Sequence, residues 1–310
     1  MRTGLSWDLA KDKDPVNAWN AVLDEIGVAN GQGYDSAWVD ETRDSAVSIS
    51  SPSTFMTAAA ARTTAIQLRS SSMHVTTHHF VRLAEEIVIV DLFSKGRAGI
   101  SFAAGSRYGA DPEHVHETID FVQTAWSADE FRYSGKYVRF PLHTPESAPR
   151  GPSEPTEHDK YVPQWEWGPA TPDFLAITPK PYAVAPPVSV EIDDDATLEW
   201  AARNSVSPFV RADIPTTEAV ERLARYRAIA DAAGQRRSAV EPTLERRVEV
   251  DGSATESTLA GSSEDLVNMV RTIKTQTGIS HFVWRRTAEQ TGRTDLLLKF
   301  AGEVQPMLQA

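Results

Sequence analysis

The stretch from Ala65 to Gly105 constrains the fold of this chain more than any other part of the sequence. Its first residues, AIQLRSSSMHV, begin apolar and β-rich, and its last residues, RAGISFAAG, read as a second strand. Between them, apolar side chains recur at helical spacing, at Phe80, Leu83, Ala84, Ile87, Val90 and Phe93. Two strands joined by a crossover helix lie parallel in a right-handed unit, so the stretch predicts one β–α–β unit of a parallel sheet.

The same alternation of strands and helices recurs along the 310-residue chain. About eight strands are indicated, near Leu5, Ala37, Ile66, Ile100, Val188, Phe209, the run 239–250 and Phe282. This count predicts an α/β fold of the (β/α)8 TIM-barrel type, formed by residues 1–310 as a single domain. An open doubly wound sheet is the alternative, although the chain has neither a G-x-G-x-x-G motif nor a Walker-type lysine loop.

Residues 127–186 differ from the rest of the chain because they are rich in proline and aromatic side chains. The sequence predicts a long insertion here, before the fifth strand. A stretch of this length without regular structure is typically a lid or a binding loop, or a surface excursion packed by its own aromatic residues. Our interpretation is that 161–182 forms a lid.

Composition excludes several classes of function. The chain has 43 acidic and 31 basic residues and a net charge of -12, which argues against a nucleic-acid or anionic-membrane partner. It has no cysteine, so thiol nucleophiles and thiolate metal sites are excluded. No apolar run approaches the length of a membrane span or a signal peptide, so a soluble cytoplasmic protein is expected.

In a barrel of this type the chemistry belongs at the carboxyl ends of the strands. The candidates there are Trp7, Asp8, Asp40, Glu41, Ser71 to His74, Ala103 to Ser106, Glu191 to Asp194, Arg211 and Trp284 to Arg286. By residue type alone they form no catalytic constellation. His74, His78 and His79 could suggest a metal, but they have no clear carboxylate partner in the sequence, and we predict no metal site.

At these residues the sequence resembles a known family. TTHHFVRLAEEIVIVDLFSKGRAGISFAAG is similar to the matching region of the bacterial luciferase family, which are flavin-dependent monooxygenases. GYDSAWVDE resembles the second strand of that family, and VSVEIDDDATLEWAARNSVSPFV resembles its fifth strand and the helix that follows. TQTGISHFVW resembles the last strand. The order and spacing of these pieces carry the resemblance along nearly the whole chain.

The resemblance implies a luciferase-like barrel in which reduced FMN, supplied by a separate flavin reductase, lies over the strand ends. With O2 it would oxygenate an organic small molecule. Carried over to this sequence, the flavin contacts are Trp7, Ser71, Ser72, Ala103, Arg107, Glu191, Ile192 and Asp194, and the catalytic candidates are Glu41, Thr42 and His74. The resemblance also implies a homodimer, or a heterodimer with a homologue, through helices 52–62 and 80–93.

The chain departs from the catalytic luciferase subunit at one catalytic position and at the positions that hold the phosphate. Ala103-Ala104 stands where that subunit has Cys-Arg, Thr42 stands where it has His, and Asp193-Asp194-Asp195 stands in its Glu-Ser-Ala-Ser segment. The three acids would repel a phosphate, and helix capping explains them better than a catalytic role does. Arg107, Arg285 or Arg286 could replace the missing arginine. Gly261-Ser262-Ser263 offers amides to an anion, or a capping box with Asp265.

Two other functions therefore stay open. The chain could be a non-catalytic partner subunit, like the second luciferase subunit. It could also be a deazaflavin (coenzyme F420)-dependent oxidoreductase on the same barrel, which transfers hydride and needs no oxygen.

Overall fold

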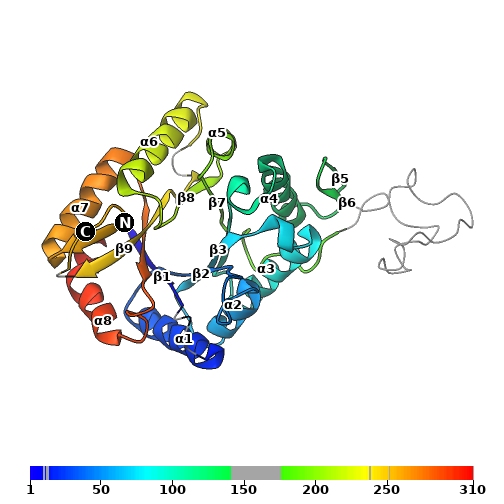
Figure 1. The fold of residues 1–310 in the computed structure, drawn as a ribbon. Coiled ribbons are helices and arrows are strands. Elements are labelled where there is room, and N and C mark those ends of the chain that lie inside the picture. Colours follow the sequence, from blue (N-terminus) through cyan, green and yellow to red (C-terminus); the bar gives the residue numbers. More distant parts are fainter. Residues whose placement is uncertain (10, 12–13, 141–175, 237–238, 251, 310) are drawn as a thin grey trace, which may run out of the picture.

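The computed structural model describes residues 1–9, 11, 14–140, 176–236, 239–250 and 252–309. Eight parallel strands form a closed barrel, seen along its axis in Figure 1. They are β1 (Arg2–Trp7), β2 (Ser36–Asp40), β3 (Gln67–Met73), β4 (Ala98–Phe102), β7 (Val188–Glu191), β8 (Ser207–Val210), β9 (Thr243–Val250) and β11 (His281–Arg286). A short strand, β10 (Thr258–Gly261), extends the sheet beside β9.

Closure of the sheet decides between the two predicted architectures. The first strand pairs with the last, with Leu5 opposite Trp284, and β8 pairs with β9 through Phe209 and Thr243. An open doubly wound sheet would leave two free edges, so that alternative is wrong and the predicted (β/α)8 barrel is confirmed.

A ring of helices covers the barrel from outside (Figure 1). They are α1 (Pro15–Gly31), α2 (Pro52–Ala60), α3 (Phe80–Ser94), α4 (Pro112–Ser127), α5 (Asp195–Arg203), α6 (Thr216–Ala232), α7 (Ser263–Thr277), α8 (Thr294–Glu303) and α9 (Gln305–Gln309). Two 3₁₀ turns, η1 (Val75–Thr77) and η2 (Gly105–Tyr108), follow β3 and β4. None of the described helices combines the length and the apolar character needed to cross a bilayer.

The sequence of α3 explains which face of this helix is buried and where the helix ends. The stripe of Leu83, Ala84, Ile87 and Val90 is buried against the barrel. On its polar face Arg82 pairs with Glu85 at 2.8 Å, as the three-residue spacing predicts. The helix ends where Lys95 adopts a left-handed conformation, followed by a glycine.

The barrel interior is layered, because alternate residues of each strand point inward. The strand β11 illustrates this pattern with His281, Val283 and Arg285. Val283, Trp38 and Phe209 form an apolar middle layer of fully buried side chains. His281 lies below this layer, at the amino ends of the strands, and Arg285 lies above it, at the carboxyl ends.

A charged cluster fills the lower layer. Arg69 pairs with Glu241 at 2.6 Å and lies over the Trp38 ring, 5.0 Å from its centroid. Glu241 also contacts the imidazole of His281 at 3.2 Å, whose other nitrogen lies 2.8 Å from the Ser36 hydroxyl. Arg2 reaches Glu241 from the rim at 2.8 Å. The cluster closes the amino end of the barrel.

The strand β3 contains a bulge. Its register against β4 pairs Ser70 with Ile100 but Met73 with Phe102, so one extra residue lies in β3. Ser72 has a φ of 53°, a left-handed conformation that costs free energy for a residue with a side chain. The surrounding barrel thus holds a strained residue at the carboxyl end of the strand.

The predicted insertion lies between α4 and β7. Its first part forms an antiparallel hairpin of β5 (Tyr133–Ser134) and β6 (Arg139–Phe140), in which Phe131 and Phe140 pack on Phe121 of α4. Residues 141–175, and with them most of the predicted lid 161–182, lie outside the described residues. The described end of that segment lies against α3, where the Tyr182 amide donates to Asp91 at 2.8 Å.

Candidate functional site

A cavity of about 1370 Å³ opens at the carboxyl ends of the strands. Its wall is built by residues of β1, β2, β3, β9 and β11, by the loops after these strands and after β8, and by one residue of α1. The lining residues are Trp7, Asp8, Leu9, Lys11, Val22, Trp38, Val39, Asp40, Glu41, Thr42, Arg43, Asp44, Ser45, Ile49, Ser72, His74, Arg211, Asp213, Glu245, Arg247, Glu249, Arg285, Thr287, Ala288, Glu289 and Thr291. The apolar middle layer forms part of its floor through Trp38.

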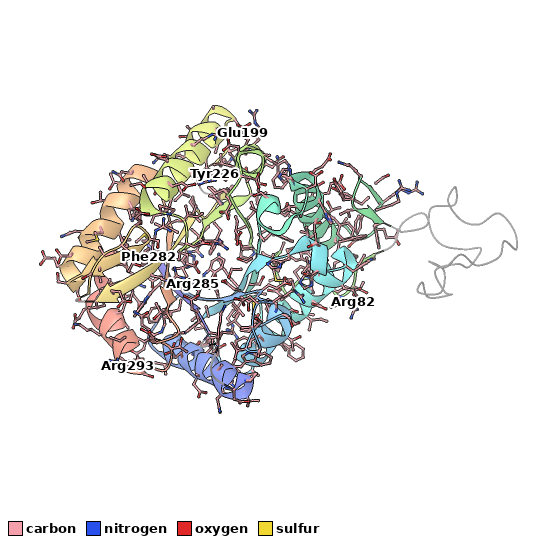
Figure 2. The ribbon with its side chains drawn as sticks, in the orientation of Figure 1. Arg82, Glu199, Tyr226, Phe282, Arg285 and Arg293 are labelled. Carbon is pink, nitrogen blue, oxygen red and sulfur yellow. The ribbon has the colours of Figure 1, made fainter. Side chains whose placement is uncertain are left out.

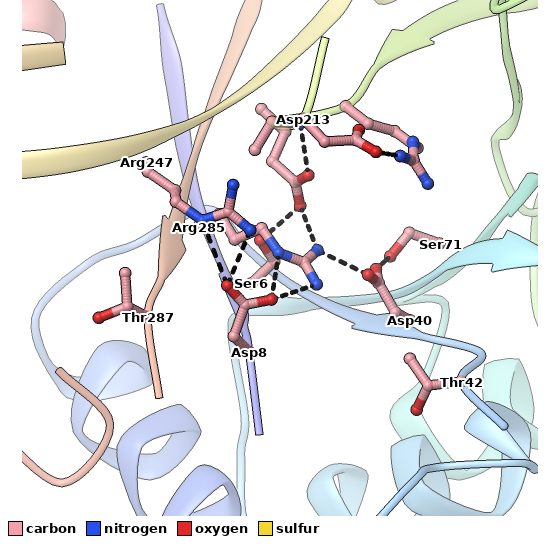
Figure 3. A network of polar contacts seen from close by, with 12 residues as sticks. Ser6, Asp8, Asp40, Thr42, Ser71, Asp213, Arg247, Arg285 and Thr287 are labelled. Carbon is pink, nitrogen blue, oxygen red and sulfur yellow. Dashed lines mark hydrogen bonds and ion pairs between the residues drawn. The ribbon is translucent and has the colours of Figure 1, made fainter. Parts of the chain in front are cut away.

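Arg285 stands at the centre of the mouth, near the barrel axis (Figure 2). Its guanidinium contacts Asp8 at 2.8 Å, Asp40 at 2.6 Å and Glu245 at 3.2 Å, which come from three other strand ends (Figure 3). These carboxylates hold the pKa of Arg285 well above its usual value, although burial alone would lower it. The arginine therefore remains charged and neutralises part of a carboxylate ring.

Further contacts fix the positions of the three carboxylates, those of Asp8, Asp40 and Glu245. Arg247 donates to Asp8 at 3.0 Å, and the Ser6 hydroxyl donates to Glu245 at 2.6 Å (Figure 3). The backbone amide of Ala212 donates to the other oxygen of Glu245 at 3.0 Å. The Ser71 hydroxyl donates to Asp40. The upper layer is thus a network whose charges hold fixed positions around the cavity.

Glu41 joins the end of β2 to the connection that follows β3. It accepts hydrogen bonds from the His74 amide at 2.9 Å and the Thr77 hydroxyl at 2.8 Å, and it lies 2.8 Å from the His78 imidazole. Burial opposes its ionisation, but the hydrogen bonds from His78 and the His74 amide lower the pKa of Glu41 to about 2. At neutral pH Glu41 is ionised, so it positions the 74–78 segment and is poorly suited to proton transfer.

Two other wall residues are held by hydrogen bonds to neighbouring parts of the chain. The Thr42 hydroxyl accepts from the Ile49 amide at 3.0 Å and closes the loop after β2. The indole of Trp7 donates to the buried Glu25 of α1 at 2.6 Å. Glu25 also pairs with Arg286 at 2.9 Å, so Arg286 points away from the mouth, toward the helices.

A different arrangement occupies the edge between β4 and β7. Glu191 is fully buried, accepts from the Ser72 hydroxyl and accepts from the Ala104 amide at 3.3 Å. Asp194 caps α5 by accepting from the Thr197 amide at 2.7 Å, as its capping interpretation predicted. The Ser106 hydroxyl donates to Asp194 at 3.4 Å. Arg107 lies in η2, but its side chain is outside the described part of the structure.

The structure brings only some of the predicted site residues together. Trp7, Glu41, Thr42, Ser72 and His74 line the cavity. Ser71 is buried behind Asp40, and Glu191 is buried behind Ser72. Ala103 and Ile192 are buried in the strand ends, where their amides donate to Met73 and Phe209. Asp194 is the cap of α5.

Sequence reasoning missed two parts of the site. Glu245 was not among the candidates, although the alternation Glu245, Arg247, Glu249 in β9 was a signal that charged residues face the barrel interior. The sequence also gave no carboxylate partner for the histidines, whereas Glu41 contacts His78. That pair joins the loop after β2 to the connection after β3, and spacing in the sequence does not reveal it. Across the described residues, no group of side chains is arranged to hold a metal ion.

Comparison of the sequence with known families identifies relatives of this chain. The sequence profile of the luciferase-like monooxygenases matches residues 5–260. The chain belongs to the luciferase-like monooxygenase family. The profile covers the barrel from β1 to β10, including every strand that lines the cavity except β11. A comparison with curated protein sequences found no match.

Solved structures of luciferase-like proteins share the fold. A monooxygenase from Streptomyces bottropensis superposes with a TM-score of 0.75 at 17% identity, over 99% of both chains. The FMN-bound oxygenating constituent of 3,6-diketocamphane monooxygenase from Pseudomonas putida gives 0.71 at 15% identity, over 99% of this chain and 98% of that one. The coenzyme F420-dependent tetrahydromethanopterin reductase from Methanopyrus kandleri gives 0.71 at 15%, over 99% of both. At such identities the likeness shows the fold alone.

Proposed function

We propose that this luciferase-like protein is a flavin-dependent monooxygenase, which uses a reduced flavin and O2 to oxygenate an organic small molecule. The observation that carries the proposal is the cavity at the strand ends. Its volume of about 1370 Å³ exceeds the roughly 300–1000 Å³ of a pocket for one ligand, so it has room for a ring cofactor and a substrate together. FMN in the camphane-oxygenating relative supports a flavin here.

The residues present suit the flavin ring better than its phosphate. Trp7, Leu9, Val39 and Ile49 give the cavity an apolar side against which an isoalloxazine ring can pack. The edge between β4 and β7, where the family resemblance predicts the phosphate, carries Asp194 at the amino end of α5. A carboxylate at about 4 Å from a phosphate costs roughly 1–4 kcal/mol per pair of charges in a wet site. FMN therefore does not fit that edge.

The protein's own residues have three tasks in this proposal. A flavin supplies the electrons that activate O2, and the protein supplies binding, orientation and exclusion of water. Glu41 fixes the backbone of His74, whose side chain lines the cavity and is the group best placed to hold or pass a proton. The strained Ser72, held by Glu191, fixes the shape of the wall beside it.

The proposal is tested by titrating the purified protein with reduced flavin without oxygen and then admitting air. We expect micromolar binding, followed by reoxidation of the bound flavin at a rate that depends on His74. His74→Gln should change that rate about tenfold or more while flavin affinity changes less than about threefold. His114→Gln is the matched control, because His114 stacks on Tyr137 outside the cavity. Absence of flavin binding in both redox states would refute the proposal.

The non-catalytic partner subunit is the second candidate. It is supported by the acid at α5 and by Ile89, Leu92 and Phe93, which are exposed on α3, within the helices predicted to form a dimer. Under this proposal the chain pairs with a catalytic homologue through that face. Sedimentation of the chain alone and with a co-expressed homologue would distinguish a heterodimer from a homodimer.

A deazaflavin-dependent oxidoreductase is a third candidate, supported by the F420-dependent relatives on the same barrel. Hydride transfer to or from coenzyme F420 needs no oxygen. Turnover that continues under argon would support it, and turnover that requires O2 would support the monooxygenase.

A further inference from the structure

The helix ends around the mouth are the first observation. Helix amino termini bind phosphates because their amides and dipole attract an anion. Four of the helices that start here are already capped by the chain itself. Asp14 caps α1, Asp111 caps α4 and Asp194 caps α5, while Ser262 and Asp265 form a capping box on α7.

The other helix amino termini around the mouth also lie close to carboxylates of the chain. The amino end of α6 carries Glu218 in its first turn, and α3 begins two residues after His78, which lies 2.8 Å from the ionised Glu41. The amino end of α8 carries Asp295, and that of α2 has Ser53 bonded to Glu86. Around the described mouth, each of these helix ends thus has a carboxylate of the chain on it or close to it.

The cations of the cavity are the second observation, and it is independent of the helices. Five basic side chains line the described wall, and each is paired with a carboxylate. Lys11 pairs with Asp44, Arg43 with Glu41, Arg211 with Asp213, and Arg247 and Arg285 with Asp8. Eight carboxylates line the same wall, so the lining has an excess of three negative charges over its lysine and arginine. A dianion would therefore compete with the chain's own carboxylates for each of these five cations.

We infer that the cavity takes a flavin without a phosphate group, of the riboflavin class, in preference to FMN. This inference rests on the proposed function and deepens it. The apolar wall packs against the isoalloxazine ring. The carboxylates around the mouth accept hydrogen bonds from the hydroxyl groups of an uncharged ribityl chain. The carboxylate of Asp194 occupies the Thr197 amide at the amino end of α5, so a terminal phosphate at this edge meets a negative charge in place of a free donor.

The experiment compares riboflavin with FMN on the intact chain. Each flavin, oxidised and then photoreduced without oxygen, is titrated by fluorescence at two salt concentrations. We expect riboflavin to bind at least as tightly as FMN, and the FMN affinity to rise with salt because salt screens the repulsion. Asp194→Asn keeps a capping side chain and removes one charge, and it should tighten FMN binding about fivefold while riboflavin affinity stays within about twofold.

Asp24→Asn is the matched control, because it removes the same charge from the exposed side of α1 and should change neither affinity. A preference of the unmodified protein for FMN of more than about threefold would overturn the inference and leave the proposed function standing. If the folded protein binds neither flavin in either redox state, both fail.

Discussion

The two ends of the barrel axis carry similar groups in different surroundings. Arg69, Glu241 and His281 lie below the Trp38 layer, and their side chains are 4%, 11% and 0% exposed. Arg285, Asp8 and Asp40 lie above it and are 13%, 30% and 15% exposed. The lower cluster is sealed by the first residues of the chain and the strand starts. The upper cluster faces a cavity.

The difference in exposure gives the lower cluster a structural role and the upper cluster a role in binding. Below Trp38, an ion pair that lost its partner would have no water to replace it, so the lower cluster is committed to holding the fold. Above it, water or a ligand can solvate the same groups, so the upper cluster can exchange partners when the cavity fills. The same residue types serve a structural role at one end and remain available for binding at the other.

The largest expected effect is at the lower end. Glu241→Gln leaves the guanidinium of Arg69 buried without its counter-charge, and we expect a loss of about 3–5 kcal/mol in the free energy of unfolding. Urea denaturation followed by tryptophan fluorescence measures it. The double variant Arg69→Met with Glu241→Gln removes the stranded charge and should recover part of the loss. A loss below about 1 kcal/mol for the single variant would contradict the structural role that we assign to the lower cluster.

The next effect is on acid stability. Burial opposes the ionisation of Glu241, but the hydrogen bond with His281 and the charge of Arg69 lower its pKa to about 2 from an ordinary value of 4.5. A carboxyl with a lowered pKa stabilises the fold fully above its unfolded pKa and stops doing so as the pH falls through the folded value. The stability should therefore fall between about pH 4.5 and 2, by about 3 kcal/mol from this group, with a further loss from Glu41. Chemical denaturation at a series of pH values measures the slope, and Glu241→Gln should make it shallower.

The smallest effect on stability is expected at the mouth. Arg285→Met leaves Asp8, Asp40 and Glu245 facing one another, but water in the cavity can solvate them, and we expect a loss of about 1–2 kcal/mol. The same denaturation experiment serves, with flavin titration as the second measurement. The variant should weaken flavin binding more than Glu241→Gln does. A loss as large as that of Glu241→Gln would mean that the two ends do not differ.

The sequence predicted the barrel because its signals are local. The apolar spacing of α3, the glycine-terminated helices and the eight apolar strands each depend on residues close together in the chain. The capping role of Asp194 was predictable for the same reason. The cluster around Arg285 was not, because Asp8, Asp40, Glu245 and Arg285 come from four strands that meet only when β1 pairs with β11. Local signals did not predict the bulge in β3 either, because Ser70 to Met73 have the sequence of an ordinary strand end.

That bulge sets the phase of everything that follows it in β3. Arg69 points into the barrel, so an unbroken two-residue alternation would turn Ser71 and Met73 inward and Ser72 and His74 toward the helices. The extra residue reverses the parity, which is why Met73 is buried in the outer core while Ser72 and His74 face the cavity. Inserting one residue between Ser72 and Met73, with the bulge kept, would shift the frame of the strand end, turn His74 outward and present a thioether to the cavity. The chemical identity of that wall is thus encoded by the number of residues in β3 as much as by their type.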